Sequence, residues 1–222
     1  MSRIFKALFI VAALLSCSQA DAQFFKRLKP SNATVKATNN KNKVVTADPD
    51  EHLLTTEVAT PVVPDKLANA VKASMMNQAE SLHHLGYDVK STRNGQVLIV
   101  TIPTEKMFAP NETALQEVYA RQLLEPFGAY LRTPGRYKIL LAVHTDDTGD
   151  KDYIEKLSDQ RALAVSKWFE QNVENVGSVR HYGLGSGDPL APNISRRNRA
   201  KNRRLEIFIV PDVELIQNIN SK

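Results

Sequence analysis

The amino-acid sequence predicts an α+β domain with the order βαβαββ, a two-layer sandwich whose helices pack on one face of a mixed sheet. Three observations predict it. A β-rich apolar run, a polar turn and a segment with helical spacing follow one another from Lys138 to Trp168. Asn94-Gly95 separates two β-rich runs, which is typical of a hairpin. An apolar run from Leu205 to Val210 indicates a core strand near the end of the chain.

The first 22 residues have the pattern of a targeting signal. Positively charged residues precede an apolar core from Ala7 to Leu15, which is shorter than the roughly 20 residues of a membrane-spanning helix. We therefore expect an exported protein with a signal peptide over residues 1–22. Cleavage after Ala22 would release a protein without a lipid, whereas cleavage before Cys17 would leave Cys17 lipidated and make a lipoprotein. The sequence leaves both open.

Residues 23–64 are rich in Asn, Lys, Thr, Val and Pro and have no sustained period, so we expect a flexible linker there. Residues 65–92 should form a helix and a strand that lead into the domain. The helix is indicated over Leu67 to Leu85, where apolar residues recur at helical spacing. We place the domain itself at residues 93–212 and a tail at residues 213–222.

Inside the domain, the second arm of the hairpin, from Gln96 to Ile102, should be the first core strand. A helix is expected from about Glu112 to Leu131, with Asn111 as its N-cap and with Pro126 kinking it or ending it early. After the central helix we expect a short strand near residues 179–182 and a glycine-rich loop, residues 183–187. That loop lacks the Gly-Lys-Ser/Thr sequence of a phosphate-binding loop.

Arg161 is the anomaly of the central helix. It falls on the apolar face that also carries Leu157, Val165 and Trp168. Burying an unpaired charge costs several kcal/mol, so Arg161 needs a partner. Asp146 stands where the preceding strand ends, and we expect the two side chains to lie close together. They could bind a ligand together, or they could form only a structural ion pair.

Several short motifs follow in a fixed order: HTDDTG at residues 144–149, LSDQRA at 157–162, GLGSGDP at 183–189 and NRAKNRRLEI at 198–207. This order resembles the OmpA-like C-terminal domain family of the bacterial cell envelope, over about half the chain, from Gly95 to Pro211. The chain departs from the family pattern at three positions. Val143 and Asn198 stand where the family usually has Gly, and Ile154 stands where it has a ligand-contacting Asn.

The resemblance implies non-covalent binding of peptidoglycan through the diaminopimelate of its stem peptide, which would link the outer membrane or periplasmic assemblies to the cell wall. Arg161 would grip the carboxylate of diaminopimelate with two parallel hydrogen bonds, and Asp146 would pair with its ammonium group. Thr148 could add a hydrogen-bond donor. Arg203 and Arg204 would offer further cationic contacts. The implied location is the periplasmic face of the outer membrane or the periplasm.

Three other functions remain open at this stage. The domain could carry a degenerate site and serve as a structural or protein-interaction module. A weaker alternative is a hydrolase that uses His144, Asp146 and Asp147. The net charge of +5 and the basic run at residues 196–204 would suit nucleic acid, but an export signal argues against that partner. We expect no cofactor and no metal, and the sequence does not predict an oligomeric state.

Overall fold

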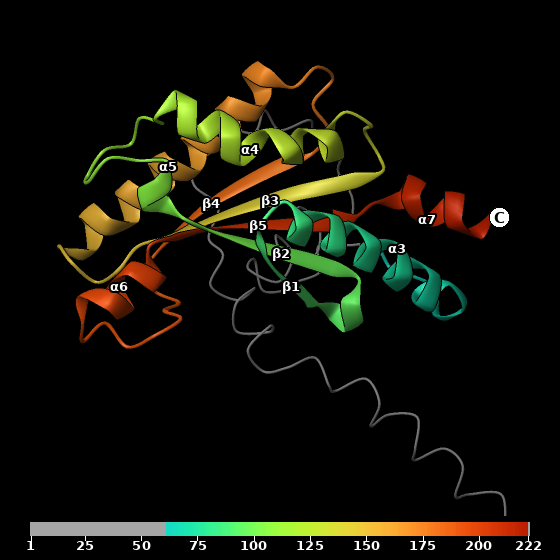
Figure 1. The fold of residues 1–222 in the computed structure, drawn as a ribbon, viewed down its shortest axis with the longest axis horizontal. Helices are drawn as coiled ribbons and strands as arrows, with labels where there is room; N and C mark the ends of the chain where they lie inside the picture. The colour runs from blue at the N-terminus through green and yellow to red at the C-terminus, as the bar shows by residue number, and fades with distance from the viewer. Residues whose placement is uncertain (1–60, 222) are drawn as a thin grey trace, which may run out of the picture.

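The structure is a computed structural model that describes residues 61–221 (Figure 1). The predicted signal peptide, Cys17 and nearly all of the predicted linker lie outside these residues. Within them, no helix is both long enough and apolar enough to cross a membrane.

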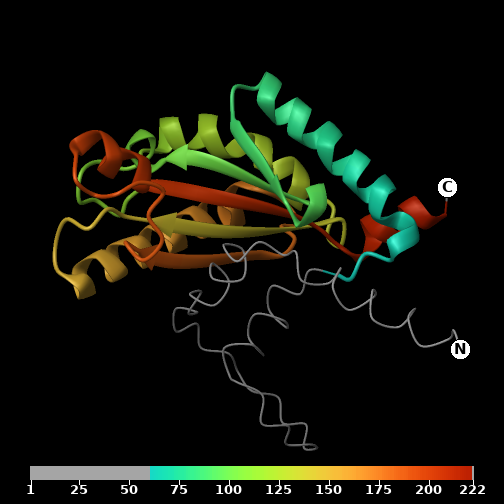
Figure 2. The ribbon, with the colours of Figure 1, turned by 90° about the horizontal axis from the view of Figure 1, so that it is seen from below.

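Five strands form one mixed sheet, as the sequence predicts (Figures 1 and 2). Their order across the sheet is β1-β2-β5-β3-β4. β3 and β4 pair in parallel, and the other neighbouring strands pair antiparallel. The strands are β1 (Asp88–Thr92), β2 (Val97–Pro103), β3 (Tyr137–His144), β4 (Val179–Gly185) and β5 (Arg204–Pro211). The hairpin, the strand before the central helix and the last core strand are all confirmed.

The larger helices cover one face of the sheet, because each presents an apolar side to it (Figures 1 and 2). The helices are α3 (Asp65–His84), α4 (Glu117–Leu131), α5 (Lys151–Asn172), α6 (Arg196–Asn202) and α7 (Val213–Asn220). Buried side chains of α3, α4, α5 and α7 join one core with one face of the strands. A smaller apolar cluster on the opposite face, as far as the structure describes it, is contributed by strands alone.

The start of the first connecting helix differs from the prediction. α4 begins at Glu117 rather than near Glu112, because residues 107–116 form a tight loop. Asn111 lies in this loop with a φ of 61°, so it does not cap the helix. The loop is closed by the backbone of Gln116, which donates a hydrogen bond of 2.8 Å to the carbonyl of Met107.

Pro126 does not end α4 early, since the helix continues to Leu131. A proline inside a helix removes one backbone hydrogen bond and costs about 3 kcal/mol. Around it, Leu124, Phe127 and Leu131 are fully buried, and burying each such side chain contributes about 1.5–3 kcal/mol. Packing therefore outweighs the local cost of the proline.

The final residues of the chain contain a helix that was not expected. Asp212 caps α7 by accepting a hydrogen bond of 2.8 Å from the backbone of Val213. Leu215 and Ile216 are buried in the main core. Their helix lies beside α3 (Figure 2). The segment regarded as a tail thus closes one end of the core.

Candidate functional site

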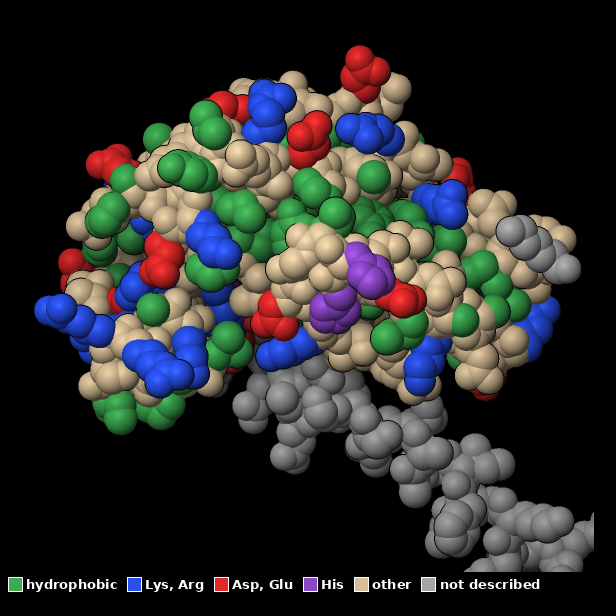
Figure 3. Space-filling model, in the orientation of Figure 1, with side chains coloured by type: hydrophobic (Ala, Val, Ile, Leu, Met, Phe, Trp, Pro, Cys, Tyr) green, Lys and Arg blue, Asp and Glu red, His purple; other side chains and the backbone are tan. Residues whose placement is uncertain are grey.

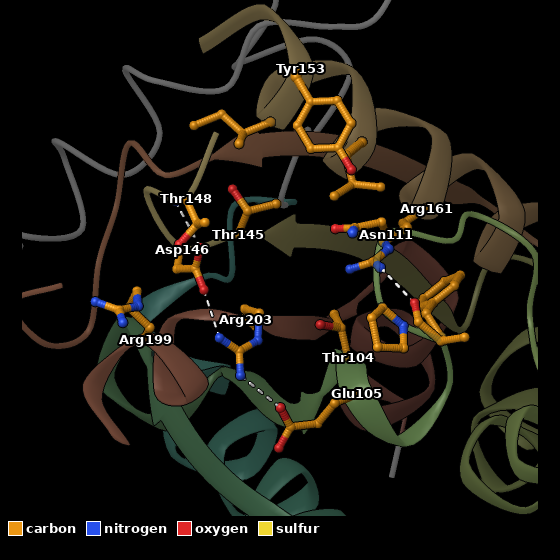
Figure 4. Close-up of a pocket in the computed structure, with 15 residues that line it drawn as sticks. Thr104, Glu105, Asn111, Thr145, Asp146, Thr148, Tyr153, Arg161, Arg199 and Arg203 are labelled. Carbon is orange, nitrogen blue, oxygen red and sulfur yellow. Dashed lines mark hydrogen bonds and ion pairs between the residues drawn. The ribbon is translucent and has the colours of Figure 1, made fainter. Parts of the chain in front are cut away.

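A cavity of about 450 Å³ opens at the end of the sheet where β3 finishes and β5 begins (Figure 4). Four segments that are distant in the sequence supply its walls. They are the end of β2 with the loop after it (Thr104, Glu105, Phe108, Ala109, Pro110, Asn111), the β3–α5 loop (Thr145, Asp146, Thr148), α5 (Tyr153, Ile154, Leu157, Arg161), and α6 with the residue after it (Arg199, Arg203). The topology of the sheet brings these segments together, since β5 lies between β2 and β3.

Asp146 supplies the cavity with a fixed negative charge. It follows β3 directly and is only 7% exposed. Its Oδ2 accepts a hydrogen bond of 2.6 Å from Arg203, and its Oδ1 accepts one of 2.9 Å from the backbone of Thr148. Burial acts to raise the pKa of Asp146, but the bonds from Arg203 and Thr148 more than offset it and hold the pKa below its usual range. The carboxyl group is therefore ionised at neutral pH.

Arg161 does not pair with Asp146, so the structural ion pair, one of the two alternatives left open by the sequence, is not formed. Its Nε donates a hydrogen bond of 2.8 Å to the carbonyl of Glu112, and its Nη2 donates one of 3.2 Å to the carbonyl of Ala109. The guanidinium carbon lies 4.9 Å from the centre of the Phe108 ring. The loop between β2 and α4 thus satisfies most of the buried guanidinium, which is the physical reason that no carboxylate is needed.

Arg161 and Asp146 nevertheless line the same cavity (Figure 4). Arg161 is 5% exposed, and its third nitrogen, Nη1, has no hydrogen-bond partner among residues 61–221. Burial lowers the pKa of Arg161, but an arginine stays charged in a protein at neutral pH. The cavity therefore presents one guanidinium nitrogen and one carboxylate to whatever enters it.

Arg203 and Arg204 are neighbours in the sequence but lie in different surroundings. Arg203 lies in the cavity and bridges two acids, since its Nη2 also donates a hydrogen bond of 3.0 Å to Glu105 (Figure 4). Arg204 is 1% exposed and donates bonds to Glu206 at 2.8 Å and to the carbonyl of Asp188 at 3.1 Å. Successive residues of a strand point to opposite faces, so only one of the two can reach the cavity. The expected ligand contact by Arg204 is corrected accordingly.

The three residues considered for a hydrolase do not converge. His144 is buried on the other face of the sheet, where its Nε2 lies 3.2 Å from the carboxylate of Glu206. Burial lowers the pKa of His144, the main opposing influence being the hydrogen bond with Glu206. Asp147 lines a separate cavity of about 300 Å³, and only Asp146 lines the larger one. In the part of the chain that the structure describes, no three His, Cys, Asp or Glu side chains are placed to hold a metal ion.

The structure adds two charged residues that sequence reasoning missed. Glu105 follows β2 by two residues, and β2 pairs with β5 up to Pro103 and Arg204. Arg199 comes from the basic run of α6, where it donates a hydrogen bond of 2.8 Å to the carbonyl of Asn193. A strand-pairing register would have revealed Glu105, but the sequence alone does not supply one.

This part of the chain is similar to known proteins. Residues 107–203 match the model of the OmpA family. They form an OmpA family domain. The outer-membrane lipoprotein YfiB of Pseudomonas aeruginosa is 38% identical over 72 residues, which are 32% of this chain and 43% of YfiB. The peptidoglycan-binding protein ArfA of Mycobacterium tuberculosis is 35% identical over 72 residues, 32% of this chain and 22% of ArfA.

A crystal structure from Desulfovibrio vulgaris, described as MotB-like, has the same fold, with a TM-score of 0.56 and 22% identity over 66% of this chain and 97% of that one. The chain spans about half the length of the first curated relatives that it matches.

The OmpA family domain departs from its usual pattern inside the cavity. Ile154 is 5% exposed and forms part of the wall between the larger cavity and its smaller neighbour. A branched aliphatic side chain offers no hydrogen bond there. Val143 is fully buried in the core, and Asn198 donates a hydrogen bond of 2.9 Å to the carbonyl of Pro192. Among the three departures, Ile154 is the one that changes the chemistry of the cavity.

Proposed function

We propose that the protein binds peptidoglycan without a covalent bond, as a cell-envelope protein, and holds the diaminopimelate of a stem peptide in the cavity. One observation carries the proposal: Asp146 and the unpaired Nη1 of Arg161 line the same 450 Å³ cavity. Diaminopimelate carries an ammonium and a carboxylate on one carbon centre. A carboxylate and a guanidinium in one enclosed cavity complement those two charges.

Four further residues contribute charge or hydrogen-bonding groups to the cavity. Arg203 already holds Asp146, but a carboxylate offers about four acceptor positions, so the ammonium of the ligand can share it. Arg199 and Arg203 add positive charge, and Glu105 and Asp146 add negative charge. Thr148 lies beside Asp146 and can donate its hydroxyl. A zwitterionic ligand suits this mixture of charges.

The proposed role is that of a binding module and not of an enzyme. His144, Asp146 and Asp147 have separate surroundings, and the strong hydrogen bond from Arg203 makes Asp146 a poor base because it lowers the pKa. Relatives that are named as an outer-membrane lipoprotein and as a peptidoglycan-binding protein support the same role. We place the protein at the periplasmic face of the outer membrane or in the periplasm, where it would connect the membrane to the wall.

Co-sedimentation with purified sacculi tests the proposal. Asp146→Asn should weaken binding at least about tenfold, since it removes the charge that meets the ammonium. Asp152→Asn is a matched control, because Asp152 is exposed in the first turn of α5 and does not line the cavity. Free diaminopimelate should compete with sacculi, and cadaverine, which has two ammonium groups but no carboxylate, should compete far less. Equal retention of the Asp146 and Asp152 variants would refute the assignment.

Ile154 favours a second candidate, a degenerate domain that serves as an interaction module. Ile154→Asn restores an amide at the cavity wall and should strengthen sacculus binding by about three- to tenfold, the value of one hydrogen bond. If the unaltered protein is not retained and Ile154→Asn alone is, the second candidate holds. If Ile154→Asn leaves binding unchanged, this position does not contact the ligand.

A further inference from the structure

A compact basic and apolar surface lies beside the cavity, and the proposed function does not use it. It consists of the loop before α6 and the outer side of α6, residues 189–201 (Figure 3). This basic α6 surface contains four Lys or Arg and no Asp or Glu. Residues 61–221 as a whole contain 20 Lys and Arg against 19 Asp and Glu, so the remainder of the described domain is net negative. The positive charge is concentrated at one corner.

Two large apolar side chains protrude from the same corner. Ile194 is 85% exposed and Leu190 is 53% exposed. A single exposed apolar residue is ordinary, but these two stand four positions apart and immediately before a cluster of cations. Folding has not buried them.

The loop that carries Leu190 and Ile194 is firmly built. The side-chain amide of Asn202 is fully buried. It donates a hydrogen bond of 2.7 Å to the carbonyl of Ala191 and accepts one of 3.0 Å from the backbone N–H of Ala191. Ser195 caps α6 by accepting a hydrogen bond of 3.1 Å from the backbone of Asn198. Arg199 also clamps the loop through the carbonyl of Asn193. These bonds hold the two apolar side chains outward in fixed positions.

The cations of α6 divide between two sides of the helix. Arg199 faces the cavity. Arg197 and Lys201 are four residues apart and therefore share a face, which is turned well away from that of Arg199. Arg196, Arg197 and Lys201 are exposed, and none of them has an ion-pair partner among the residues described. Their charge is available to an external anion.

We propose that the basic α6 surface docks onto an anionic phospholipid membrane. Ile194 and Leu190 enter the boundary between head groups and acyl chains, while Arg196, Arg197 and Lys201 meet the phosphates and anionic head groups. A hydrated glycan strand would offer the two apolar side chains no partner. A soft lipid interface accepts isolated protruding side chains without a matching groove.

Vesicle sedimentation tests this with the full chain carrying Cys17→Ser, so that no acyl chain contributes. Vesicles of phosphatidylcholine alone are compared with vesicles containing about one third phosphatidylglycerol. The Arg197→Glu/Lys201→Glu variant should bind the anionic vesicles at least about tenfold more weakly than its parent. Leu190→Ser/Ile194→Ser should weaken binding severalfold at unchanged charge. Added salt should weaken the binding of the parent, because it screens exposed charges.

Lys156→Glu/Lys167→Glu is the matched control, since both lysines are exposed on α5 and the change in net charge is the same. It should retain vesicle binding. Equal binding to neutral and anionic vesicles, or equal losses in the α6 and α5 variants, would overturn the proposal. If the α6 variant binds vesicles like its parent but loses retention on sacculi, the surface is a second wall contact and not a membrane contact. Sacculus binding through Asp146 is measured separately, so failure of one proposal does not affect the other.

Discussion

Arg161 shows how a single residue can serve both the fold and the site. Two of its nitrogens hold the carbonyls of Ala109 and Glu112, which belong to the loop that walls the cavity. The third nitrogen has no partner among residues 61–221 and is the one that we propose contacts the ligand. The hydrogen bonds of Arg161 therefore connect α5 to the loop between β2 and α4, and not to Asp146.

Replacing Arg161 should affect stability and binding in separable ways. Arg161→Leu leaves both carbonyls without a donor and should lower the free energy of unfolding by about 2–3 kcal/mol. Arg161→Lys should cost less, about 1 kcal/mol, because an ammonium can still reach one carbonyl. Sacculus binding should fall in both. Urea unfolding and co-sedimentation provide the two measurements.

A double-mutant cycle then asks whether Arg161 and Asp146 interact directly. Because Asp146 pairs with Arg203, the effects of Arg161→Leu and Asp146→Asn on unfolding should add to within about 0.5 kcal/mol. A coupling of several kcal/mol would mean that the two form a buried ion pair after all.

Glu206 should make the stability of the protein depend on pH in the acid range. Burial acts to raise its pKa, but the hydrogen bond with His144 and the charge of Arg204 hold the pKa at about 2, against an ordinary value of 4.5. A carboxyl group with a lowered pKa stabilises the fold above its unfolded-state pKa and loses that contribution as the pH falls. The shift corresponds to about 3 kcal/mol, lost between pH 4.5 and 2.

Unfolding by urea at pH 7, 5, 4 and 3 measures this loss. Glu206→Gln should lower stability at pH 7, because it leaves Arg204 with Asp188 as its remaining acidic partner, and should flatten the decline below pH 4.5. An unchanged decline in Glu206→Gln would assign the acid sensitivity to other groups. His144 also lowers the stability of the protein as the pH falls, but at higher pH than Glu206. Burial lowers its pKa, so protonation of His144 favours the unfolded state.

Among the elements, helix α5 packs closely against strand β4. Gly183 lies in β4 directly beneath α5, and a Cβ there would overlap the backbone of Asp159 and lie 2.7 Å from the carbonyl carbon of Ser158. Ser158 is fully buried, and its hydroxyl donates a hydrogen bond of 2.8 Å to the carbonyl of Glu155 and accepts one of 3.0 Å from the backbone of Gly185. These contacts set the distance between the sheet and α5, the helix that carries Arg161.

Gly183→Ala should force α5 away from the sheet. We expect a loss of about 3 kcal/mol in the free energy of unfolding, because backbone atoms cannot swing aside as a flexible side chain can. Gly187→Ala is the control, since its nearest neighbour would lie 3.4 Å away, an ordinary contact. Thermal or urea unfolding of the two variants decides. Equal stability would show that the helix accommodates a methyl group.

The elements that the sequence predicts well are those with local patterns. The hairpin at Asn94-Gly95, strand β3 and helix α5 follow from turn chemistry and hydrophobic period. Helix α7 could also have been predicted from the sequence, since Asp212 is a good N-cap and Leu215, Ile216 and Ile219 have helical spacing.

The site is harder to predict, because its contacts join distant segments. The carbonyls that satisfy Arg161 lie 49 and 52 residues away from it in the sequence, and Arg203 lies 57 residues from Asp146. No local pattern encodes such pairs. Strand alternation does say that only one of Arg203 and Arg204 can face the cavity, but the register with β2 decides which.

On the scale of the whole molecule, the two proposed binding surfaces lie at one end. The cavity and α6 stand at the end of the sheet opposite to α7 and the start of α3 (Figures 1 and 2). The two proposed binding surfaces share α6, with Arg199 facing the cavity and Arg197 facing away. A bilayer held against α6 would lie about one helix diameter, 10 Å, from the cavity.

Membrane and wall should therefore compete for the protein. Anionic vesicles should reduce retention on sacculi, whereas neutral vesicles should not. Arg197→Glu/Lys201→Glu should remove the effect of anionic vesicles. Simultaneous, undiminished binding of sacculi and vesicles would show that the two surfaces are independent.

The position of the cavity also has a mechanical consequence. A ligand fixed to the wall would pull at one end of the sheet, while the chain leading into α3 would pull at the other (Figure 2). The strands run along this line, and the hydrogen bonds between them run across it. Such a load shears the bonds of β2, β5 and β3 together and does not unzip them one at a time. The sheet is thus oriented to resist the tension that a link between membrane and wall would transmit.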